Sequence, residues 1–487
     1  MTKKLLLTFL TVLTFTASFG QNTDAQRYVE KLDSESPLGD AIWGILAVKQ
    51  TGDTLANLYS HKKMVPASNN KLITTGLALR DLGEHHRFTT RLGYEGRIQN
   101  GVLKGDLYII GGGDPTIASS DSIATPVNEL FARWASFIRD AGIRKIDGRV
   151  IGDGRYFEGV DVGSWEYDDL GYDYGASGDG LCFYENIQDF RVVPGAKPQD
   201  KVDVIPLYPK TPWISLKNIS KTGEAGSGNE LVYYNSALSY DALMTGTLGV
   251  DSKTRKVACS NRYGALTCAH YFTEYLKANG IVVKDDAGDT SDATADKGSL
   301  VIIGQTYSPE VGDIVKICNH RSDNFYAETL FKQLSMSMYN SCTYDIAPEA
   351  VKRYLESHGV DTSYGINTAD GSGLSRHNYI SPDFFVRFLT MMFRSDVFGT
   401  YCESLPGPGR GTLTHRMKNE PESVKSRCYF KTGSMGGVRC FSGYILPSDG
   451  KSENTIVFSL MTNNVAGEKV NVYDLMGRIV SLLAKEN

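Results

Sequence analysis

Three short motifs in this chain of 487 residues contain the side chains needed for nucleophilic catalysis by a serine. The first is Ser68-Asn69-Asn70-Lys71, in which a serine and a lysine stand three positions apart. On a helix, residues i and i+3 share one face. A lysine can activate a serine hydroxyl as a base when burial lowers its pKa. The motif therefore predicts Ser68 as a nucleophile and Lys71 as its base.

The same serine-to-lysine spacing occurs at Ser60 and Ser448, so context has to separate the copies. Ser60 ends a predicted strand, and Ser448 lies in a Pro-Ser-Asp-Gly turn. Ser68 begins a predicted helix over residues 69–82, whose N-terminus adds partial positive charge and free N–H groups around the hydroxyl. The alternative is a helix cap at Ser68 and a solvated charge at Lys71.

The second motif is Ser322-Asp323-Asn324, directly before a predicted helix. The serine can pass a proton, and the amide of Asn324 can donate a hydrogen bond to a substrate carbonyl. The same S-x-N spacing recurs at residues 68–70, 227–229 and 452–454. A helix cap is the alternative interpretation of this motif as well.

The third motif is Lys431-Thr432-Gly433, which precedes a glycine-rich turn and a predicted strand. On a strand, Lys431 and Gly433 face one way and Thr432 the other. A glycine there allows a ligand to approach the backbone closely. A second copy, residues 221–223, lies in a polar loop. The alternative for Lys431 is an ordinary lysine of a hairpin.

The elements that carry these motifs indicate one domain split in sequence by an insertion. Residues 41–48 and 54–59 predict a hairpin, and the middle of the chain changes to short strands and turns rich in glycine and aspartate. We therefore expect an α/β (α+β) fold, with a catalytic domain of residues 21–84 and 297–487. The inserted region, residues 85–296, is expected to be mainly β, with two subdomains. Helices are predicted over residues 25–32, 69–82, 310–319, 324–334 and 470–483.

Composition excludes several classes of protein. The chain has 41% apolar and 22% charged residues, typical of a globular protein and not of a disordered one. Its 51 Lys and Arg against 56 Asp and Glu give a net charge of −5, without a basic block, so nucleic acid is not an expected partner. No H-E-x-x-H motif is present, and neither metal nor organic cofactor is expected.

The N-terminus predicts export. Lys3 and Lys4 precede an apolar run, and Ser18-Phe19-Gly20 places small residues before a cleavage point. These features predict a signal peptide over residues 1–20 and a mature protein in the periplasm, without a membrane span. Disulfides can form there, and among the eight cysteines Cys259 and Cys268 are the expected local pair.

Together, S-x-x-K, S-D-N and K-T-G form the signature of penicillin-binding proteins and class A β-lactamases. The chain resembles the three-domain D-alanyl-D-alanine carboxypeptidase/endopeptidase family of low-molecular-mass penicillin-binding proteins. Supporting stretches are residues 105–116, 370–378 and 411–413, and the long segment 72–321 between the first two motifs is typical of that family. The resemblance implies a catalytic domain of the β-lactamase/transpeptidase type, an antiparallel sheet with flanking helices.

The resemblance also implies roles for individual residues. Ser68 would form an acyl ester, with Lys71 as base, and Ser322 would pass a proton to the leaving amine. Lys431 would hold the terminal carboxylate of the substrate. The backbone N–H groups of Ser68 and Ser434 would form the oxyanion hole. The other residues implied at the active site are Asn324, Thr432 and Gly433.

For the diamino acid of the substrate peptide, the resemblance implies a pocket of Arg376, Asp153 and Phe157. The alternatives are a surface salt bridge for Arg376 and a turn with a core aromatic for the other two. Gly436 and Gly437 stand where relatives often carry a polar side chain, a departure that bears on substrate contacts there.

The expected function is a periplasmic peptidoglycan hydrolase, a D-alanyl-D-alanine carboxypeptidase, a D,D-endopeptidase, or both. Its expected partners are peptidoglycan stem peptides and cross-links, with β-lactams as covalent inhibitors. A β-lactamase is less favoured, because the sequence has no Glu-x-x-Leu-Asn segment that would supply a deacylating carboxylate. A non-catalytic protein that binds peptidoglycan or senses penicillin is the remaining alternative.

Overall fold

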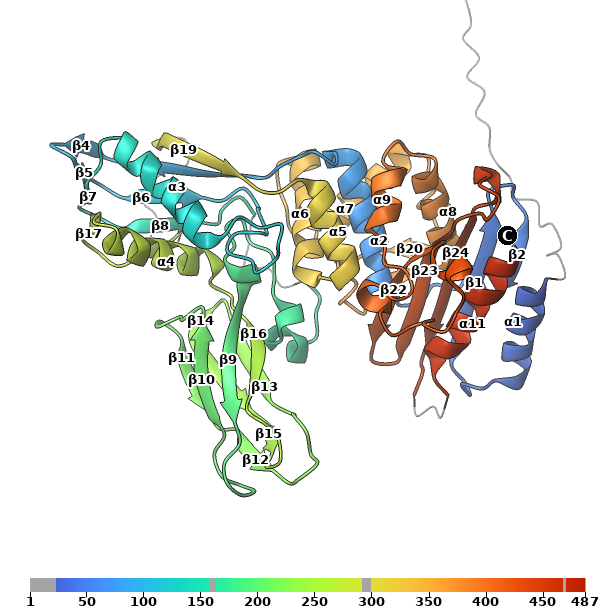
Figure 1. Cartoon of the computed structure of the whole chain (residues 1–487). Helices are drawn as coiled ribbons and strands as arrows, with labels where there is room; N and C mark the ends of the chain where they lie inside the picture. The colour runs from blue at the N-terminus through green and yellow to red at the C-terminus, as the bar shows by residue number, and fades with distance from the viewer. Residues whose placement is uncertain (1–22, 158–162, 291–298, 467–469, 487) are drawn as a thin grey trace, which may run out of the picture.

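The computed structural model of the chain describes residues 23–157, 163–290, 299–466 and 470–486. They form two large parts side by side, one built from both ends of the chain and one from its middle (Figure 1). The predicted signal peptide, residues 1–20, lies outside the described residues.

The part that carries the three motifs is built on one antiparallel sheet of five strands: β1 (Ile42–Lys49), β2 (Thr54–Leu58), β22 (Cys428–Met435), β23 (Val438–Ile445) and β24 (Ile456–Asn463). Their order is β2-β1-β24-β23-β22. Because β1 pairs along its length with β24, Ile42 lies opposite Asn463. The sheet therefore needs strands from both ends of the chain. This pairing is the physical reason why the domain is split in sequence.

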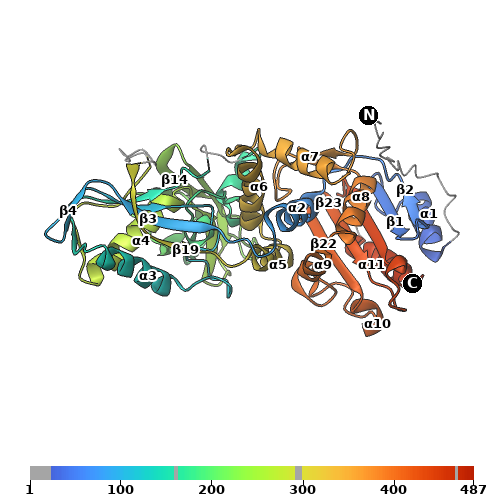
Figure 2. The same cartoon turned by 90° about the horizontal axis from the view of Figure 1, so that it is seen from above.

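Helices cover both faces of this sheet: α1 (Asp24–Glu35), α2 (Lys71–Leu77), α5 (Val311–Arg321), α6 (Asn324–Tyr339), α7 (Ala347–Ser357), α8 (Pro382–Phe393), α9 (Phe398–Ser404) and α11 (Val472–Lys485). On one face α1 and α11 share a core with Trp43, Phe441 and Phe458. On the other face the remaining helices form a larger core, in which α5 and α6 lie between the sheet and the middle part of the chain (Figures 1 and 2).

The helix predicted over residues 69–82 has three sections. A 3₁₀ turn η1 (Ala67–Asn70) precedes α2, and a π-helical turn η2 (Ala78–Leu82) follows it. Every residue of α2 is buried. Burial on all sides explains why the apolar residues of this segment show only a loose helical period.

The first part of the insertion contains two small sheets and two helices, α3 (Val127–Asp140) and α4 (Gly264–Ala278). One sheet has the order β18-β8-β6-β3-β19 and the other β17-β7-β5-β4. A shared core of Trp134, Phe131 and Phe272 holds the helices on them. The strands are β3 (Thr89–Tyr94), β4 (Arg97–Gln99), β5 (Val102–Lys104), β6 (Leu107–Ile110), β7 (Lys145–Ile146), β8 (Val150–Asp153), β17 (Val282–Val283), β18 (Gly288–Asp289) and β19 (Val301–Tyr307).

The second part of the insertion is a smaller β unit that projects from the first (Figure 1). It has its own core around Phe190, Tyr233 and Met244. The second copy of Lys-Thr-Gly, residues 221–223, is a strand of this unit. The strands are β9 (Ile187–Val193), β10 (Asp203–Tyr208), β11 (Ser215–Asn218), β12 (Lys221–Gly223), β13 (Val232–Ser236), β14 (Ser239–Thr245), β15 (Thr247–Gly249) and β16 (Arg255–Ser260).

Strand β19 shows where the chain leaves the insertion. It lies after the expected boundary at residue 297 but pairs antiparallel with β3, so it belongs to the sheet of the insertion. At the crossing point, Ser308 N–H donates to the Phe88 carbonyl at 2.9 Å, and Phe88 N–H donates to Ser308 Oγ at 2.9 Å. The entering and leaving chains are thus tied together, and the second boundary lies near residue 308.

All eight cysteines are free and buried. Cys259 on β16 packs in the core of the smaller β unit, whereas Cys268 on α4 packs in the core of the first part. The expected Cys259–Cys268 pair is therefore wrong, because the two thiols belong to different cores.

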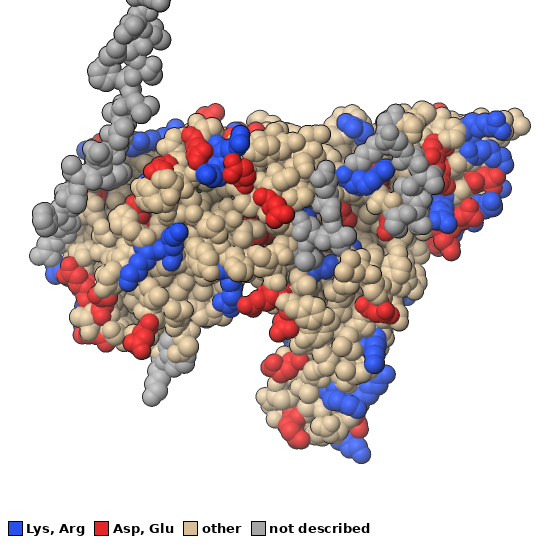
Figure 3. All heavy atoms as spheres, turned by 180° about the vertical axis from the view of Figure 1, so that it is seen from behind, with Lys and Arg blue, Asp and Glu red and all other residues tan. Residues whose placement is uncertain are grey.

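On the face of the molecule in Figure 3, basic and acidic side chains are interspersed over both parts. This distribution agrees with the near balance of 51 basic and 56 acidic residues. Among the described residues, no helix is both long and apolar enough to cross a membrane.

Candidate active site

Ser68 lies within η1, and two neighbouring amides anchor this turn. Asn69 Nδ2 donates to Ser442 Oγ at 2.7 Å, and Asn70 Nδ2 donates to the Asp370 carbonyl at 2.6 Å. In a 3₁₀ turn the side chains at i and i+3 eclipse each other. Ser68 and Lys71 therefore point the same way, and Ser68 is not a helix cap.

Lys71 is fully buried, so it is not a solvated charge. Its Nζ donates to Ser68 Oγ at 3.0 Å, Asn324 Oδ1 at 2.6 Å and the Ser372 carbonyl at 2.8 Å. These acceptors match the three N–H groups of an ammonium. Burial lowers the pKa of Lys71 from its ordinary value, and nearby acidic groups partly oppose this effect. After losing a proton, Nζ is placed to accept the proton of Ser68.

Lys431 and Ser322 form the opposite side of the site. Lys431 Nζ donates to Ser322 Oγ at 2.8 Å and to the Thr432 carbonyl at 2.9 Å. Ser322 ends α5 in the left-handed region, with φ of 60°, and is not the cap of the next helix. Lys431 is fully buried, and its pKa is held well below the ordinary value by burial and then by the charge of Lys71. The charge of Lys71 thus disfavours the protonated form of Lys431.

Asn324 begins α6, which is capped by Asp323 through the N–H of Tyr326 at 2.9 Å. Asn324 Oδ1 accepts from Lys71, and Nδ2 donates to the Tyr174 carbonyl at 2.9 Å. The amide donor expected for a substrate carbonyl is therefore engaged by the insertion. In this arrangement Asn324 orients Lys71.

Gly433 has a packing role that its sequence context did not indicate. A Cβ at this position would lie 2.5 Å from the Pro66 carbonyl oxygen and 3.2 Å from Asn69 N. A side chain at Gly433 would therefore collide with the backbone at the start of η1. Thr432 Oγ1 donates to Thr412 Oγ1 at 3.0 Å.

Replacing Gly433 by alanine is expected to lower the free energy of unfolding by about 1–3 kcal/mol, because β22 and η1 must separate. Acylation of Ser68 should slow as well, since η1 carries this predicted nucleophile. Gly436→Ala is the control on the same hairpin, because its Cβ would meet only the flexible end of Arg376 at 3.2 Å. Thermal unfolding of both variants is the measurement, and equal melting temperatures would contradict the packing role.

The motifs meet in a cavity of 410 Å³. Ser68, Ser322, Asn324 and Ser434 line it together with Arg376. The insertion contributes three further lining residues that the sequence did not single out, namely Glu166, Asp169 and Tyr174. Thr432 and Gly433 are not among the described residues that line it.

Arg376 lines this cavity. Its Nε lies 3.0 Å from Glu166 Oε1, and its Nη1 donates to the Gly436 carbonyl at 3.3 Å. Both side chains of the ion pair are exposed, so the pair contributes little stability and is open to exchange with a ligand.

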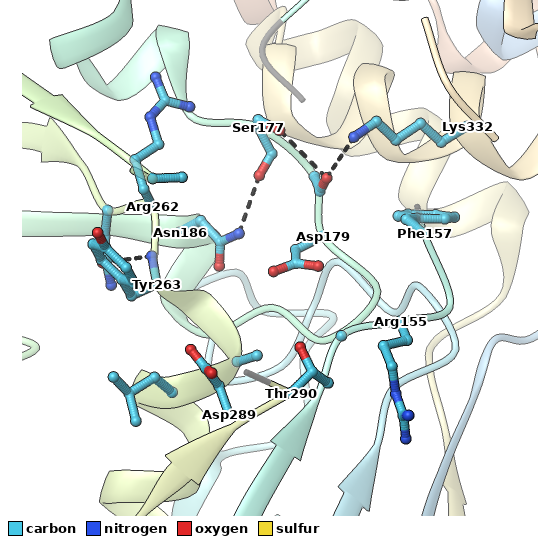
Figure 4. A pocket seen from close by; sticks show the side chains of 16 residues that line it. Arg155, Phe157, Ser177, Asp179, Asn186, Arg262, Tyr263, Asp289, Thr290 and Lys332 are labelled. Atoms are coloured by element: carbon cyan, nitrogen blue, oxygen red, sulfur yellow. Dashed lines mark hydrogen bonds between the residues drawn. The ribbon is translucent and has the colours of Figure 1, made fainter. Parts of the chain in front are cut away.

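Asp153 and Phe157 do not lie among the described residues of this cavity. The Asp153 carboxylate is buried and bound by Arg155, with Nε at 2.9 Å and Nη2 at 2.8 Å. Phe157 lines a second cavity, of 490 Å³, where Figure 4 shows it beside Lys332 of α6. Neither is found beside Arg376, because Arg155 binds the Asp153 carboxylate and Phe157 lies between the insertion and α6.

The segment that supplies the missed residues is docked on the catalytic domain. Trp165 Nε1 donates to Asp370 Oδ2 at 3.0 Å, and the Ser164 and Ser375 hydroxyls are 2.6 Å apart. The sequence feature that could have indicated these lining residues is the dense run of acidic and aromatic residues 165–169 in the insertion.

Comparison with known families agrees with this geometry. A model of the D-Ala-D-Ala carboxypeptidase 3 (S13) family matches residues 25–485. The chain belongs to this family. The resemblance inferred from the motifs is thereby confirmed, and the carboxypeptidase 3 family is one of serine-type carboxypeptidases.

Curated relatives in this carboxypeptidase family extend over nearly the whole chain. A D-alanyl-D-alanine carboxypeptidase from an Actinomadura species is 29% identical over 93% of this chain and 83% of its own length. The D-alanyl-D-alanine carboxypeptidase DacB of Haemophilus influenzae is 25% identical over 91% of this chain and 90% of its own length.

Solved structures share the fold. Penicillin-binding protein 4 of Haemophilus influenzae has a TM-score of 0.78 at 21% identity, covering 93% of this chain and 97% of that one. A predatory peptidoglycan endopeptidase from Bdellovibrio bacteriovorus has a TM-score of 0.51 at 13% identity, covering 92% and 94%. The expected penicillin-binding fold class is confirmed.

Proposed function

We propose that this protein is an exported peptidoglycan hydrolase that cleaves after D-alanine through an acyl ester on Ser68. One observation carries the proposal: the Ser68–Lys71 pair and the Ser322–Lys431 pair, from distant parts of the chain, meet at one cavity. The family membership and the carboxypeptidase relatives support the same activity.

In the first step Ser68 Oγ attacks the carbonyl carbon of the penultimate D-alanine, and Lys71 takes the hydroxyl proton. The N–H groups of Ser68 and Ser434 stabilise the negative oxygen that forms. Ser322, held by Lys431, passes a proton to the leaving nitrogen as the C–N bond breaks. Water then hydrolyses the ester, which releases a carboxylate and restores Ser68.

Lys431 supplies the charge that holds the terminal carboxylate of the substrate. An incoming carboxylate offsets the burial and the repulsion from Lys71 that disfavour its protonated form. Binding and protonation of Lys431 are therefore coupled, which favours substrates that end in a carboxylate.

The stem peptide extends from Ser68 toward Arg376 and Glu166. Arg376 can exchange its exposed Glu166 partner for a carboxylate of the diamino acid. Gly436 places no side chain next to Arg376, so Arg376 carries this contact.

Replacing Arg376 by alanine is expected to raise the KM for stem peptides about 10-fold. A change of this size corresponds to the loss of one charge-assisted hydrogen bond. Acylation by penicillin, which lacks the diamino acid, should change much less. Arg353→Ala is the control, since Arg353 is also exposed and paired with a glutamate, at 3.2 Å on α7. Steady-state kinetics on both substrates tests this, and equal losses on peptide and penicillin would contradict it.

A β-lactam would acylate Ser68 in the same way and remain as a slow ester. The penicillin-binding protein 4 structure from Haemophilus influenzae has also been solved with a β-lactam bound. The mature protein is proposed to act in the periplasm, which the predicted signal peptide and the proposed peptidoglycan substrate support.

Digestion of purified sacculi tests the proposal. Release of D-alanine from pentapeptides is expected for carboxypeptidase activity, and loss of cross-linked dimers for endopeptidase activity; either product supports the proposal. Unchanged muropeptides would favour a protein that only binds peptidoglycan. Rapid turnover of penicillin without change to muropeptides would favour a β-lactamase.

A further inference from the structure

A buried carboxylate behind Lys71 has no part in the steps above. Glu328 lies on α6 with no exposed surface. Its Oε1 accepts the N–H of Ser372 at 2.7 Å, and its Oε2 accepts the N–H of Gly371 at 3.1 Å. The Tyr344 hydroxyl donates to the same Oε2 at 3.0 Å. Three donors to one carboxyl group favour its ionised form, which only accepts hydrogen bonds.

The two residues that Glu328 holds also face the catalytic helix. The Ser372 carbonyl accepts from Lys71 Nζ at 2.8 Å, and the Gly371 carbonyl accepts from Thr74 Oγ1 at 2.8 Å. The carboxylate therefore binds the N–H side of the same residue whose carbonyl binds Lys71.

Close packing leaves this segment little freedom to move. A Cβ on Gly371 would lie 2.5 Å from Phe331 Cβ and 2.7 Å from the Ala327 carbonyl oxygen, so the segment lies directly on α6. The neighbouring carboxylate of Asp370 binds other donors, including the N–H groups of Gly373 and Ser375. The N–H groups of residues 371 and 372 are thus left to Glu328.

Helix α6 contacts Lys71 in two ways. Asn324 and Glu328 are one turn apart and share a face of the helix. Asn324 accepts from Lys71 directly, whereas Glu328 acts through Ser372. Two of the three acceptors around Lys71 Nζ, Asn324 Oδ1 and the Ser372 carbonyl, are therefore positioned by this face of α6.

We propose that Glu328 is a positioning residue for acylation, which holds the Ser372 carbonyl against Lys71 and so keeps Nζ aimed at Ser68. This inference rests on the proposed role of Lys71 as the base. The segment around Gly371 and Ser372 is then part of the catalytic machinery through its backbone.

The charge of Glu328 adds a second effect. Together with Asp370, Asp323 and Cys318 it raises the pKa of Lys71 against the larger lowering by burial. Burial and the nearby Asp370 in turn raise the pKa of Glu328 to about 7. Removing the negative charge should let Lys71 lose its proton at lower pH.

The test is the second-order rate constant for acylation by a fluorescent penicillin, measured over a pH series. The rate constant is calculated per protein molecule that can be labelled. In Glu328→Gln the alkaline plateau is expected to fall about 10- to 100-fold, because an NH2 group, which cannot accept a hydrogen bond, replaces one of the two carboxylate oxygens. The midpoint of the acid limb should move to lower pH. A loss of folded protein alone would lower the labelled fraction without moving the midpoint.

Two variants complete the design. Glu328→Asp keeps the charge but shortens the reach, so the plateau should fall while the midpoint stays. Asp81→Asn is the matched carboxylate-to-amide control in the same domain, where Asp81 pairs with His358 at 2.8 Å, and it should behave as wild type.

A wild-type plateau and midpoint in Glu328→Gln would overturn the inference. If that variant does not fold, Glu328→Asp decides alone, and a wild-type plateau there overturns it. Failure of the wild-type protein itself to label at Ser68 would instead overturn the proposed function.

Discussion

Replacement of Ser68 by alanine is expected to abolish covalent labelling by a fluorescent penicillin and to lower D-alanine release by about 10,000-fold or more. The reason is geometric: Ser68 Oγ lies 3.0 Å from the buried Lys71 Nζ and lines the 410 Å³ cavity. Without an oxygen there, no acyl ester forms. Gel fluorescence and a D-alanine assay measure the two effects.

Ser60→Ala is the matched control, because Ser60 precedes a lysine at the same spacing. Ser60 is buried next to α8, where its carbonyl accepts the N–H of Asp383 at 3.0 Å, and it does not line the cavity. This variant should label like wild type. Persistent covalent labelling of Ser68→Ala would show that another residue is the nucleophile.

Replacement of Lys71 by methionine is the second large effect, an expected loss of about 100- to 10,000-fold in the rate of acylation. Methionine has similar length and fills the buried space, but it neither accepts a proton nor binds Asn324 and Ser372. Stopped-flow acylation by penicillin gives the rate, and thermal unfolding shows whether the fold persists.

The pH dependence of the wild-type protein checks the same role. A base must be neutral to accept a proton, so the acylation rate should rise with pH as Lys71 loses its proton. Burial lowers the pKa of Lys71, so the midpoint should lie below the ordinary pKa of a lysine.

Lys332→Met is the control for removing a buried lysine. Lys332 is also buried on α6, but its Nζ donates to the Gly178 carbonyl at 2.9 Å and lines the second cavity. Its loss can destabilise the protein without removing the base. A Lys71→Met variant that acylates no more slowly than Lys332→Met would exclude Lys71 as the base.

The main signals of the catalytic centre were local in the sequence. The S-x-x-K spacing places two side chains on one face whether the turn is 3₁₀ or α, so it holds without knowledge of the tertiary fold. The other two copies of this spacing, at Ser60 and Ser448, could be distinguished from Ser68 because no predicted helix follows them. The split domain was also predictable. A hairpin near each end of the chain has unpaired strand edges, and the two hairpins satisfy them by joining in one sheet.

Contacts between residues far apart in the chain could not be predicted from such local patterns. The family resemblance implied one pocket for Asp153 and Arg376, but Arg155 binds the Asp153 carboxylate, and Arg376 pairs with Glu166. Nor did the sequence show that a side chain at Gly433 would collide with the Pro66 carbonyl oxygen.

By itself, then, the sequence determined the family and the α/β class, and it predicted the nucleophile and its base, since each depends on residue types at short fixed spacings. Only the tertiary structure decided that Asn324 faces Lys71 and Tyr174, that β19 joins the insertion, and that Glu328 stands behind the base. These are pairings across long stretches of chain. Which donor meets which acceptor there depends on packing, because a buried polar group binds the partner that the fold brings within reach.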